Sequence, residues 1–155
     1  MASSPYITAE GYAELNQELN ARWARRRDVV KALSAAAAEG DRSENAEYIY
    51  RKKELREIDR RIRYLQKRLP DLKVVDQAPD NKDHIFFAAW VTVETEEGDE
   101  KEYRIVGPDE IDASKGYISI DSPLARKLLG KTIDDEVVIE VAGQKKVYFV
   151  LAIRY

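Results

Sequence analysis

The sequence predicts an α+β protein, in which an N-terminal antiparallel two-helix coiled coil precedes a small antiparallel β-sheet domain with one short helix. Two observations predict this fold class. Over residues 1–75, helix-forming residues carry apolar side chains three and four positions apart. Over residues 84–155, short runs rich in Val, Ile, Tyr and Phe alternate with turn-forming residues. We therefore divide the chain into a hairpin at 1–75, a linker at 76–83 and a globular domain at 84–155.

The first helix is expected from Thr8 to Ala38, a stretch with no proline and Gly11 as its only glycine. Thr8 is a suitable N-cap because its hydroxyl can accept a hydrogen bond from a free amide of the first turn. Arg22 and Arg26 interrupt the heptad pattern in the middle of the helix, so the apolar seam is imperfect. The predicted seam consists of Tyr12, Leu15, Leu19, Trp23, Val30, Leu33 and Ala37.

The second helix is expected from about Glu44 to Leu69, and Pro70 should end it. Gly40 is placed to terminate the first helix, and Asp41 or Ser43 is placed to cap the second. Because the connection is short, the two helices should be antiparallel neighbours. The heptad positions of the second helix are Leu55, Ile58, Ile62, Leu65 and Leu69.

The globular domain should contain five strands and one short helix. Gly98 and the pair Ala142-Gly143 are expected to form hairpin turns. The helix should begin after the N-cap Ser122, with Pro123 as its first residue, and should end at Gly130. The predicted strands are Phe86–Glu94, Glu102–Val106, Tyr117–Ile120, Glu136–Val141 and Lys146–Ile153.

The composition excludes several kinds of site. The 155 residues include no cysteine, which excludes disulfides, thiolate metal sites, iron–sulfur clusters and a cysteine nucleophile. The single histidine, His84, has no serine or second histidine at a suggestive spacing, and we interpret it as a surface residue. The sequence contains no glycine-rich phosphate loop, metal-ligand cluster or nucleophile elbow. These absences argue against an autonomous enzyme.

The net charge of −3 conceals an asymmetry between the halves of the chain. Residues 1–75 hold 16 basic and 12 acidic side chains, whereas residues 76–155 hold 10 basic and 17 acidic ones. Such an asymmetry suggests two modules with different partners. No stretch approaches the roughly 18 apolar residues of a membrane span, and the first twelve residues lack the pattern of a signal peptide. We therefore expect a cytoplasmic protein.

Three acidic residues, Asp41, Glu44 and Glu47, gather at the predicted turn of the hairpin. One interpretation is structural, because Asp-x-x-Glu at a helix start matches a capping box and acidic groups suit the positive end of the helix dipole. The other is a pair of carboxylates presented to a divalent cation. Mg²⁺ prefers six oxygen ligands, so two carboxylates bind it tightly only if another molecule supplies the rest.

Basic residues flank this acidic tip on both helices. They form either a solvated charged face, interleaved with acidic residues, or a phosphate-binding stripe. Tyr48 and Tyr50 either stack on bases or pack against the opposite helix. The basic residues of the second helix are Arg51, Lys52, Lys53, Arg56, Arg60, Arg61 and Arg63, and those of the first are Arg22, Arg25, Arg26 and Arg27.

Several motifs resemble one known family. The segment GDRSENAEY at 40–48 and its helical continuation to Leu69 resemble the Gre family of bacterial transcript-cleavage factors, in its GreB branch. The similarity continues through FFAAWV at 86–91, RIVGPDEID at 104–112 and YISIDSPLARKLLGK at 117–131. It covers nearly the whole chain.

The resemblance implies a function carried out inside another protein. The coiled coil would enter the secondary channel of RNA polymerase, where Asp41 and Glu44 complete the coordination of a catalytic Mg²⁺ shared with the polymerase, and Ser43 belongs to the same tip motif. The polymerase would then cleave backtracked RNA and release its 3′ fragment. On this view the chain is a cofactor of the polymerase and not itself an enzyme, with no metal bound tightly to the isolated monomer.

The same resemblance assigns two further surfaces. The C-terminal domain is implied to be FKBP-like and to dock on the rim of the polymerase β′ subunit through Asp121, Ser122 and Pro123, although capping of the following helix also explains the first two residues. The alternatives are a channel-binding regulator that does not stimulate cleavage and an unrelated coiled-coil adaptor. The candidate RNA-binding residues are Arg51, Lys52, Lys53, Arg56 and Arg60.

Overall fold

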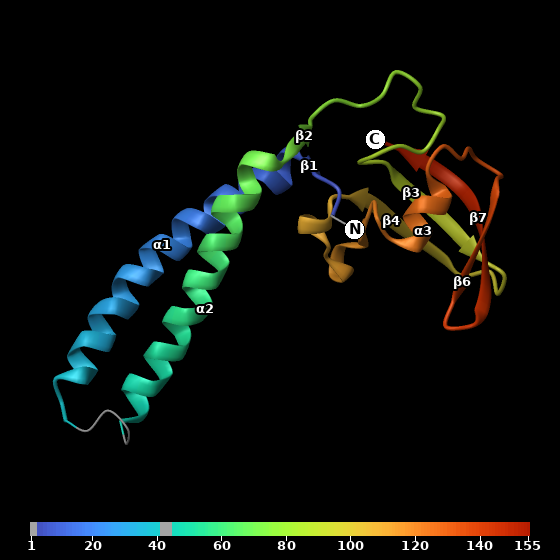
Figure 1. The fold of residues 1–155 in the computed structure, drawn as a ribbon. Coiled ribbons are helices and arrows are strands. Elements are labelled where there is room, and N and C mark those ends of the chain that lie inside the picture. Colours follow the sequence, from blue (N-terminus) through green and yellow to red (C-terminus); the bar gives the residue numbers. More distant parts are fainter. Residues whose placement is uncertain (1–2, 41–44) are drawn as a thin grey trace. The chain divides into compact units, whose positions relative to one another are not determined.

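The computed structural model describes residues 3–40 and 45–155. Tyr12–Asp71 forms one compact unit, and the described residues before Tyr12 join Leu72–Tyr155 in the other. The first unit is a helical hairpin, and the second contains a curled β-sheet with one α-helix (Figure 1). The predicted fold class is therefore confirmed. The residues before Tyr12, however, group with the sheet and not with the hairpin predicted at 1–75.

The hairpin consists of α1 (Ala9–Ala37) and α2 (Ala46–Arg68), which lie side by side in Figure 1. Thr8 caps α1 as predicted, because its hydroxyl accepts a hydrogen bond of 3.1 Å from the amide of Gly11. A short 3₁₀ helix at Leu69–Asp71 follows α2 and contains the proline that was expected to end the second helix.

The N-cap of α2 is Asn45, and the prediction that Asp41 or Ser43 caps this helix was wrong. The side-chain oxygen of Asn45 accepts a hydrogen bond of 3.0 Å from the amide of Tyr48. Its side-chain nitrogen donates to the carbonyl of Ala36, at 2.8 Å. One amide side chain thus satisfies a free donor of α2 and also binds a carbonyl near the end of α1, which accepts a second hydrogen bond of 3.2 Å from the amide of Glu39.

The apolar seam of α1 is shifted by one position in its C-terminal half. Val29 and Ala36 are buried, whereas the predicted members Val30 and Ala37 are only half-buried. Trp23 was also predicted in the seam, but 38% of its surface is exposed. The prediction failed because it followed the apolar residues through the polar middle of the helix and lost the register there.

The observed seam of α1 keeps a heptad spacing, but arginines occupy two of its positions. From the buried Leu15, alternating steps of four and three residues lead through Arg22 and Arg26 to the buried positions. The Nε atom of Arg26 lies 2.6 Å from a carboxylate oxygen of Asp59 on α2, so an ion pair replaces an apolar contact. The predicted seam of α2 is confirmed by the burial of Ile58, Ile62, Leu65 and Leu69.

The larger sheet of the second unit, which we call the sheet unit, has five strands in the order β5-β4-β3-β7-β6. Neighbouring strands are antiparallel except β4 and β5, which are parallel. The hairpin turns predicted at Gly98 and at Ala142-Gly143 connect β3 to β4 and β6 to β7. The strands are β3 (Trp90–Thr95), β4 (Glu100–Val106), β5 (Tyr117–Ser119), β6 (Glu136–Val141) and β7 (Gln144–Arg154).

The first strand of this sheet begins at Trp90, four residues later than predicted. Ala88 adopts a left-handed conformation with φ of +72°, which interrupts an extended strand. The preceding segment is held by Tyr155, whose hydroxyl donates to the carbonyl of His84 at 2.7 Å and accepts from the amide of Phe86 at 2.8 Å. Burial raises the pKa of this tyrosine.

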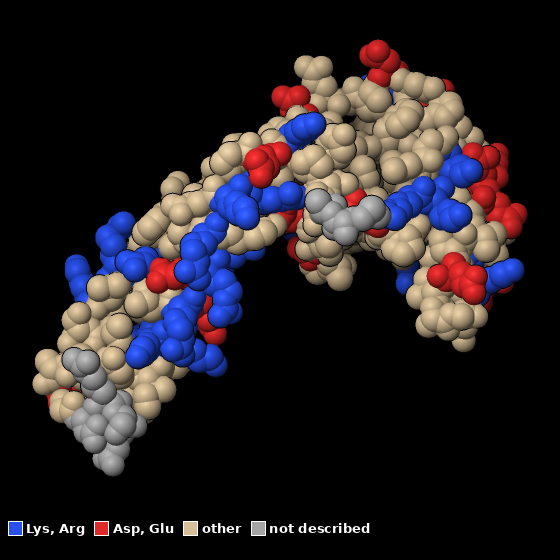
Figure 2. Space-filling model, viewed as in Figure 1, with Lys and Arg blue, Asp and Glu red and all other residues tan. Residues whose placement is uncertain are grey.

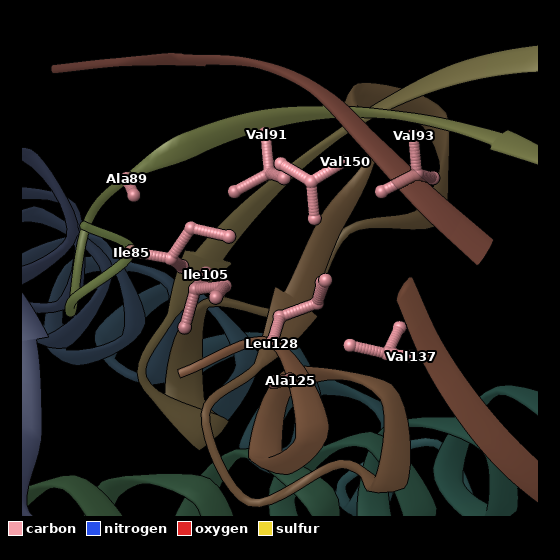
Figure 3. Packing of buried hydrophobic residues seen from close by; sticks show 9 residues of the cluster. All are labelled: Ile85, Ala89, Val91, Val93, Ile105, Ala125, Leu128, Val137 and Val150. Carbon is pink, nitrogen blue, oxygen red and sulfur yellow. The ribbon is translucent and has the colours of Figure 1, made fainter. Parts of the chain in front are cut away.

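The core of this unit lies between one face of the sheet and helix α3 (Pro123–Leu128). The hydroxyl of Ser122 accepts a hydrogen bond of 3.3 Å from the amide of Ala125, which confirms the predicted N-cap. Figure 3 shows the core side chains converging from the sheet and the helix. They are Ile85, Ala89, Val91, Val93, Ile105, Ala125, Leu128, Val137 and Val150.

A two-stranded parallel ribbon was missed by the sequence analysis. Its strands are β1 (Tyr6–Thr8), which leads into α1, and β2 (Lys73–Val75), which follows α2. Each strand has only three residues, and more than sixty residues separate them in the sequence. Neither strand is long enough to show a period of two, so local pattern could not reveal their pairing.

A carboxylate ties this ribbon to the rest of the sheet unit. Glu110, in a short 3₁₀ helix, accepts hydrogen bonds from the Thr8 amide at 3.1 Å, from the Thr8 hydroxyl, and from the Gly107 amide at 2.8 Å. A Cβ atom on Gly11 would overlap the Glu110 carboxylate, and one on Gly107 would overlap the carbonyl oxygen of Tyr6. Both glycines are therefore required by close approach.

The packing around Gly11 gives a prediction about stability. Replacing glycine by alanine in a helix normally stabilises a protein by about 0.5–1 kcal/mol. Here we expect Gly11→Ala to destabilise the full-length protein by about 1–3 kcal/mol because of the overlap. In a Glu110→Ala background the same change should be stabilising. Thermal unfolding of the four proteins, followed by circular dichroism, measures both effects, and effects of the same sign in the two backgrounds would contradict the prediction.

Candidate functional site

The predicted tip residues Asp41, Ser43 and Glu44 lie outside the described residues, so the structure describes only their flanks. On one side is Gly40, with φ of +132°, three residues beyond the end of α1. On the other side is Asn45, whose side chain bonds to both helices. The two carboxylates therefore belong to an eight-residue connection, residues 38–45, between two helix ends that a hydrogen bond holds together.

The chemistry of these residues fits a magnesium site only in part. Carboxylate oxygens are ligands that Mg²⁺ prefers, but Asp41 and Glu44 supply two side chains for an ion that takes six oxygens. Within residues 3–40 and 45–155, no cluster of three or more acidic or histidine residues could hold a metal ion. Glu47, the third acidic residue of the tip, forms an ion pair of 2.9 Å with Arg51.

Exposed cations form a continuous line along α2, which we call the basic stripe. Its members recur at spacings of three and four, so that they share one helix face. This face is opposite the buried seam of α2, and Figure 2 shows Lys and Arg side chains gathered along the hairpin. None of the five forms an ion pair with another described residue. The basic stripe consists of Lys52, Arg56, Arg60, Arg63 and Lys67.

Two of the predicted RNA-binding residues lie off this stripe. Arg51 is half-buried and forms ion pairs with Glu47 at 2.9 Å and Glu54 at 2.8 Å, and these hydrogen bonds raise its pKa. Lys53 is exposed and lines a groove between the helices. The structure thus brings Lys52, Arg56 and Arg60 together and separates Arg51 from them. A helical period of 3.6 applied to the sequence would have made this distinction.

The arginines predicted on α1 are mostly engaged in ion pairs. Arg22 lies 3.2 Å from Glu18 on the same helix, and Arg25 lies 2.9 Å from Glu54 on α2. Arg26 is paired with Asp59, as described above. For these three residues the structural interpretation holds, because their charges are already neutralised by neighbours. Arg27 is exposed, and it is the one arginine of the four that forms no ion pair with another described residue.

The groove between the two helices has a volume of about 490 Å³. Tyr50 lies at its edge with 60% of its surface exposed, whereas Tyr48 is half-buried beneath Lys52, whose Nζ lies 5.7 Å from the ring centroid. Tyr50 is therefore the more exposed of the two tyrosines, although the Cζ atom of Arg51 lies 5.2 Å from its ring centroid. The groove is lined by Glu18, Ala21, Arg22, Arg25, Tyr50, Lys53, Glu54, Glu57 and Ile58.

The predicted docking residues form the loop before α3. Asp121 accepts a hydrogen bond of 2.9 Å from the amide of Ser4 and another from the Ser4 hydroxyl. Its own amide donates to the hydroxyl of Ser119 at 3.0 Å. Ser122 is the N-cap of α3 and Pro123 its first residue. The structure thus gives each of the three residues a structural role, and it adds Ser4 to them.

An apolar hollow of about 310 Å³ lies beside this loop. It was not foreseen, because its walls come from three separate segments. Ile111 at its edge is 60% exposed, which is unusual for an isoleucine. The lining residues are Tyr103, Ile111, Ala113, Gly116, Tyr117, Ile118, Ser119 and Ser122.

His84 was interpreted as a surface residue, and it is half-buried near the edge of the sheet unit. Its Nδ1 atom lies 2.7 Å from the side-chain nitrogen of Asn81. Its ring is stacked against Phe86, with centroids 6.2 Å apart. These contacts hold the imidazole ring of His84 in place, and neither of them involves a second histidine or a nucleophile.

Comparison with known proteins identifies the class. A family model described as "Transcription elongation factor, N-terminal" matches residues 5–74, and one described as "Transcription elongation factor, GreA/GreB, C-term" matches residues 79–155. Between them they cover the hairpin and the sheet unit. The class defined by fold and sequence is therefore that of transcription elongation factors.

Individual relatives refine this assignment. The chain is 55% identical over 156 residues to the transcription elongation factor GreB of Yersinia pestis, covering 100% of this chain and 91% of that protein. It is 55% identical over 155 residues to GreB of Pseudomonas aeruginosa, covering 99% and 92%. The protein belongs to the GreA/GreB family, in its GreB branch. Among the described residues, no helix is long and apolar enough to cross a membrane.

The ion pairs of the hairpin give a pH dependence. Hydrogen bonds from Arg61, and the charges of Arg61 and Arg22, lower the pKa of Glu18 below its usual 4.5. A carboxyl with a lowered pKa in the folded state stabilises that state above its unfolded pKa, and this contribution is lost as the pH falls through the lowered value.

We therefore expect Glu18→Gln to destabilise the protein by up to about 1 kcal/mol at pH 7 and to have a smaller effect in acid. Melting temperatures between pH 3 and 7 test this. Glu57→Gln is the matched control, since Glu57 lines the same groove without an ion pair in the described structure. An effect of Glu18→Gln that is the same at every pH would count against the assigned pair.

Proposed function

We propose that this protein binds RNA polymerase, inserts its helical hairpin into the secondary channel, and stimulates the polymerase's endonucleolytic cleavage of nascent RNA in backtracked, arrested complexes. The observation that carries this proposal is the position of Asp41 and Glu44, in the eight-residue connection (residues 38–45) between two long helices whose ends Asn45 joins. We also propose that it acts in the cytoplasm as a monomer.

In this proposal the tip residues complete an active site that belongs to the polymerase. Asp41 and Glu44 would hold a Mg²⁺ ion together with oxygen ligands from the polymerase, and Ser43 would donate a hydrogen bond to the same network. The ion supplies Lewis-acid stabilisation of developing negative charge and lowers the pKa of a bound water. The capping of α2 by Asn45 supports this role, because the helix start does not need the two carboxylates.

The basic stripe would bind the phosphates of the backtracked RNA. Its exposed cations follow one face of α2, a geometry that suits a polyanion lying along the helix. Tyr50, with its exposed ring, would stack on a base of this RNA. Arg51 would contribute less than predicted, since its charge is engaged by Glu47 and Glu54.

The sheet unit would dock on the rim of the polymerase β′ subunit. Asp121, Ser122 and Pro123 form an ordered loop before α3, and an apolar hollow of about 310 Å³ lies next to it. Polar groups beside an apolar hollow are the usual composition of a protein-binding surface. The hollow therefore supports docking at this loop.

The alternative is a regulator that occupies the same channel without stimulating cleavage. The presence of both carboxylates in the tip favours the cleavage factor, because such a regulator would not need them. Measuring cleavage and polymerase binding with the same wild-type preparation separates the two, since the regulator would bind without increasing the rate of cleavage.

The metal-donating role gives the first functional prediction. Asp41→Asn and Glu44→Gln should each reduce stimulated cleavage of backtracked RNA at least about tenfold, because each removes a charged oxygen ligand. Polymerase binding should remain within roughly twofold of wild type, since the docking loop is unchanged. The assay compares rates in stalled, backtracked complexes at saturating protein.

Glu39→Gln is the matched control for these variants. Glu39 is an exposed carboxylate two residues before Asp41, and its neutralisation should leave cleavage unchanged. Wild-type cleavage by Asp41→Asn, or an equal loss in Glu39→Gln, would refute metal donation by the tip.

The basic stripe gives the second functional prediction. Combined neutralisation of Lys52, Arg56 and Arg60 should reduce the cleavage of long backtracked segments more than that of short ones. The slope of log affinity against log salt should become shallower by about 0.7 for each phosphate that the variant no longer neutralises. Arg51→Gln, on the same helix but ion-paired, should leave both quantities nearly unchanged. An equal loss at every fragment length would exclude the stripe as the RNA-binding surface.

A further inference from the structure

The first described residues of the chain lie against the loop before α3. The amide of Ser4 donates to Oδ2 of Asp121 at 2.9 Å, and the Ser4 hydroxyl donates to Oδ1. A single residue thus binds both oxygens of the carboxylate. Two hydrogen bonds in this arrangement fix the orientation of the carboxylate as well as its position, and both are strengthened by its charge.

Ordered structure supports both sides of this contact. On one side, the carbonyl of Pro5 accepts a hydrogen bond of 2.8 Å from the amide of Lys73, and strand β1 begins at the next residue. On the other side, the Asp121 amide donates to the hydroxyl of Ser119, which is 8% exposed. The amide of Ser122 donates to the Ser119 carbonyl at 2.9 Å. The contact therefore joins two fixed segments of the sheet unit.

The consequence concerns the residues that follow Asp121. Ser122 caps α3 and Pro123 begins it. Because Asp121 directly precedes them, its position determines the conformation in which the loop meets a partner. A loop already held in its bound conformation loses less conformational entropy when it binds a partner. Removing the Ser4 hydroxyl would take away the hydrogen bond to Oδ1 of Asp121, and the loop would be held less firmly.

We infer that Ser4 is a positioning residue for polymerase docking, which acts by fixing Asp121 and the loop that leads to Pro123. The inference rests on the proposed function, since docking through this loop belongs to that proposal. It assigns a role to a residue near the N-terminus, 117 positions away from Asp121 in the sequence. Because Ser4 acts through Asp121 in this inference, and not at the tip of the hairpin, its effect should be confined to affinity.

The test uses full-length Ser4→Ala in the cleavage assay with backtracked complexes. The protein concentration that gives half-maximal cleavage should rise roughly three- to tenfold, the size expected for the loss of one typical hydrogen bond. The maximal rate at saturating protein should stay at the wild-type value, because the tip residues are unchanged. Ser4→Thr keeps the hydroxyl and should restore the wild-type concentration dependence.

Two controls separate positioning from a general loss of stability. Ser3→Ala changes an exposed neighbouring hydroxyl and should have no effect. Ser4→Ala in an Asp121→Ala background should cause no further loss of affinity, since both changes break the same hydrogen bond. Additive losses in that double variant would overturn the inference, as would a wild-type half-maximal concentration for Ser4→Ala, or a lower maximal rate.

Direct binding to RNA polymerase keeps this inference distinct from the proposed function. If wild-type protein fails to stimulate cleavage, the proposed cleavage activity is refuted. The binding constant of Ser4→Ala then decides the inference by itself, since weaker polymerase binding supports it and unchanged binding overturns it.

Discussion

The carboxylate of Glu110 is the constraint on which the organisation of the chain depends. It binds the amide and hydroxyl of Thr8 and the amide of Gly107, and so fixes the first turn of α1 to the sheet unit. The ribbon of β1 and β2 then pairs the segments that enter and leave the hairpin. Because the carboxylate lies against Gly11, no side chain fits there. In the sequence, the hairpin is therefore an insertion between two segments of the sheet unit, and these two segments pair with each other.

Within the hairpin, helix geometry divides the cations into two groups with different roles. Arginines at or beside the seam, such as Arg26 and Arg61, are neutralised by carboxylates of the opposite helix and hold the helices together. Cations on the outer face of α2, such as Arg56 and Arg60, remain available to solvent. The excess positive charge of the first half of the sequence therefore overstates the charge that a phosphate backbone would meet. What matters for binding is the helix face on which each cation lies.

The sequence predicted those features that depend on neighbouring residues. The cap at Ser122, the turn at Gly98 and the alternation of the strands are local, and each was confirmed. The cap at Asn45 was missed because Asp41 and Ser43 have equally suitable side chains, and the choice depends on where α1 ends. The β1–β2 ribbon and the contacts of Glu110 join residues far apart in sequence, so no local pattern predicts them. Likewise, the metal-binding role of Asp41 and Glu44 was predicted from the family resemblance, because the Asp-x-x-Glu pattern alone favoured helix capping.

The cap at Asn45 bears directly on how the tip could work. A capping box would have engaged Asp41 and Glu44 in hydrogen bonds to the backbone of α2, and those bonds would compete with any metal. The N-cap of α2 is instead Asn45, which lies outside that Asp-x-x-Glu pair. The same side chain binds the carbonyl of Ala36, so a hydrogen bond joins the ends of α1 and α2 on either side of the connection. Fixing the ends reduces the entropy lost when the carboxylates are brought to a metal in another protein. Asp41 and Glu44 could thereby supply ligands to a metal ion in another protein, although the described residues of this chain contain no metal-binding cluster.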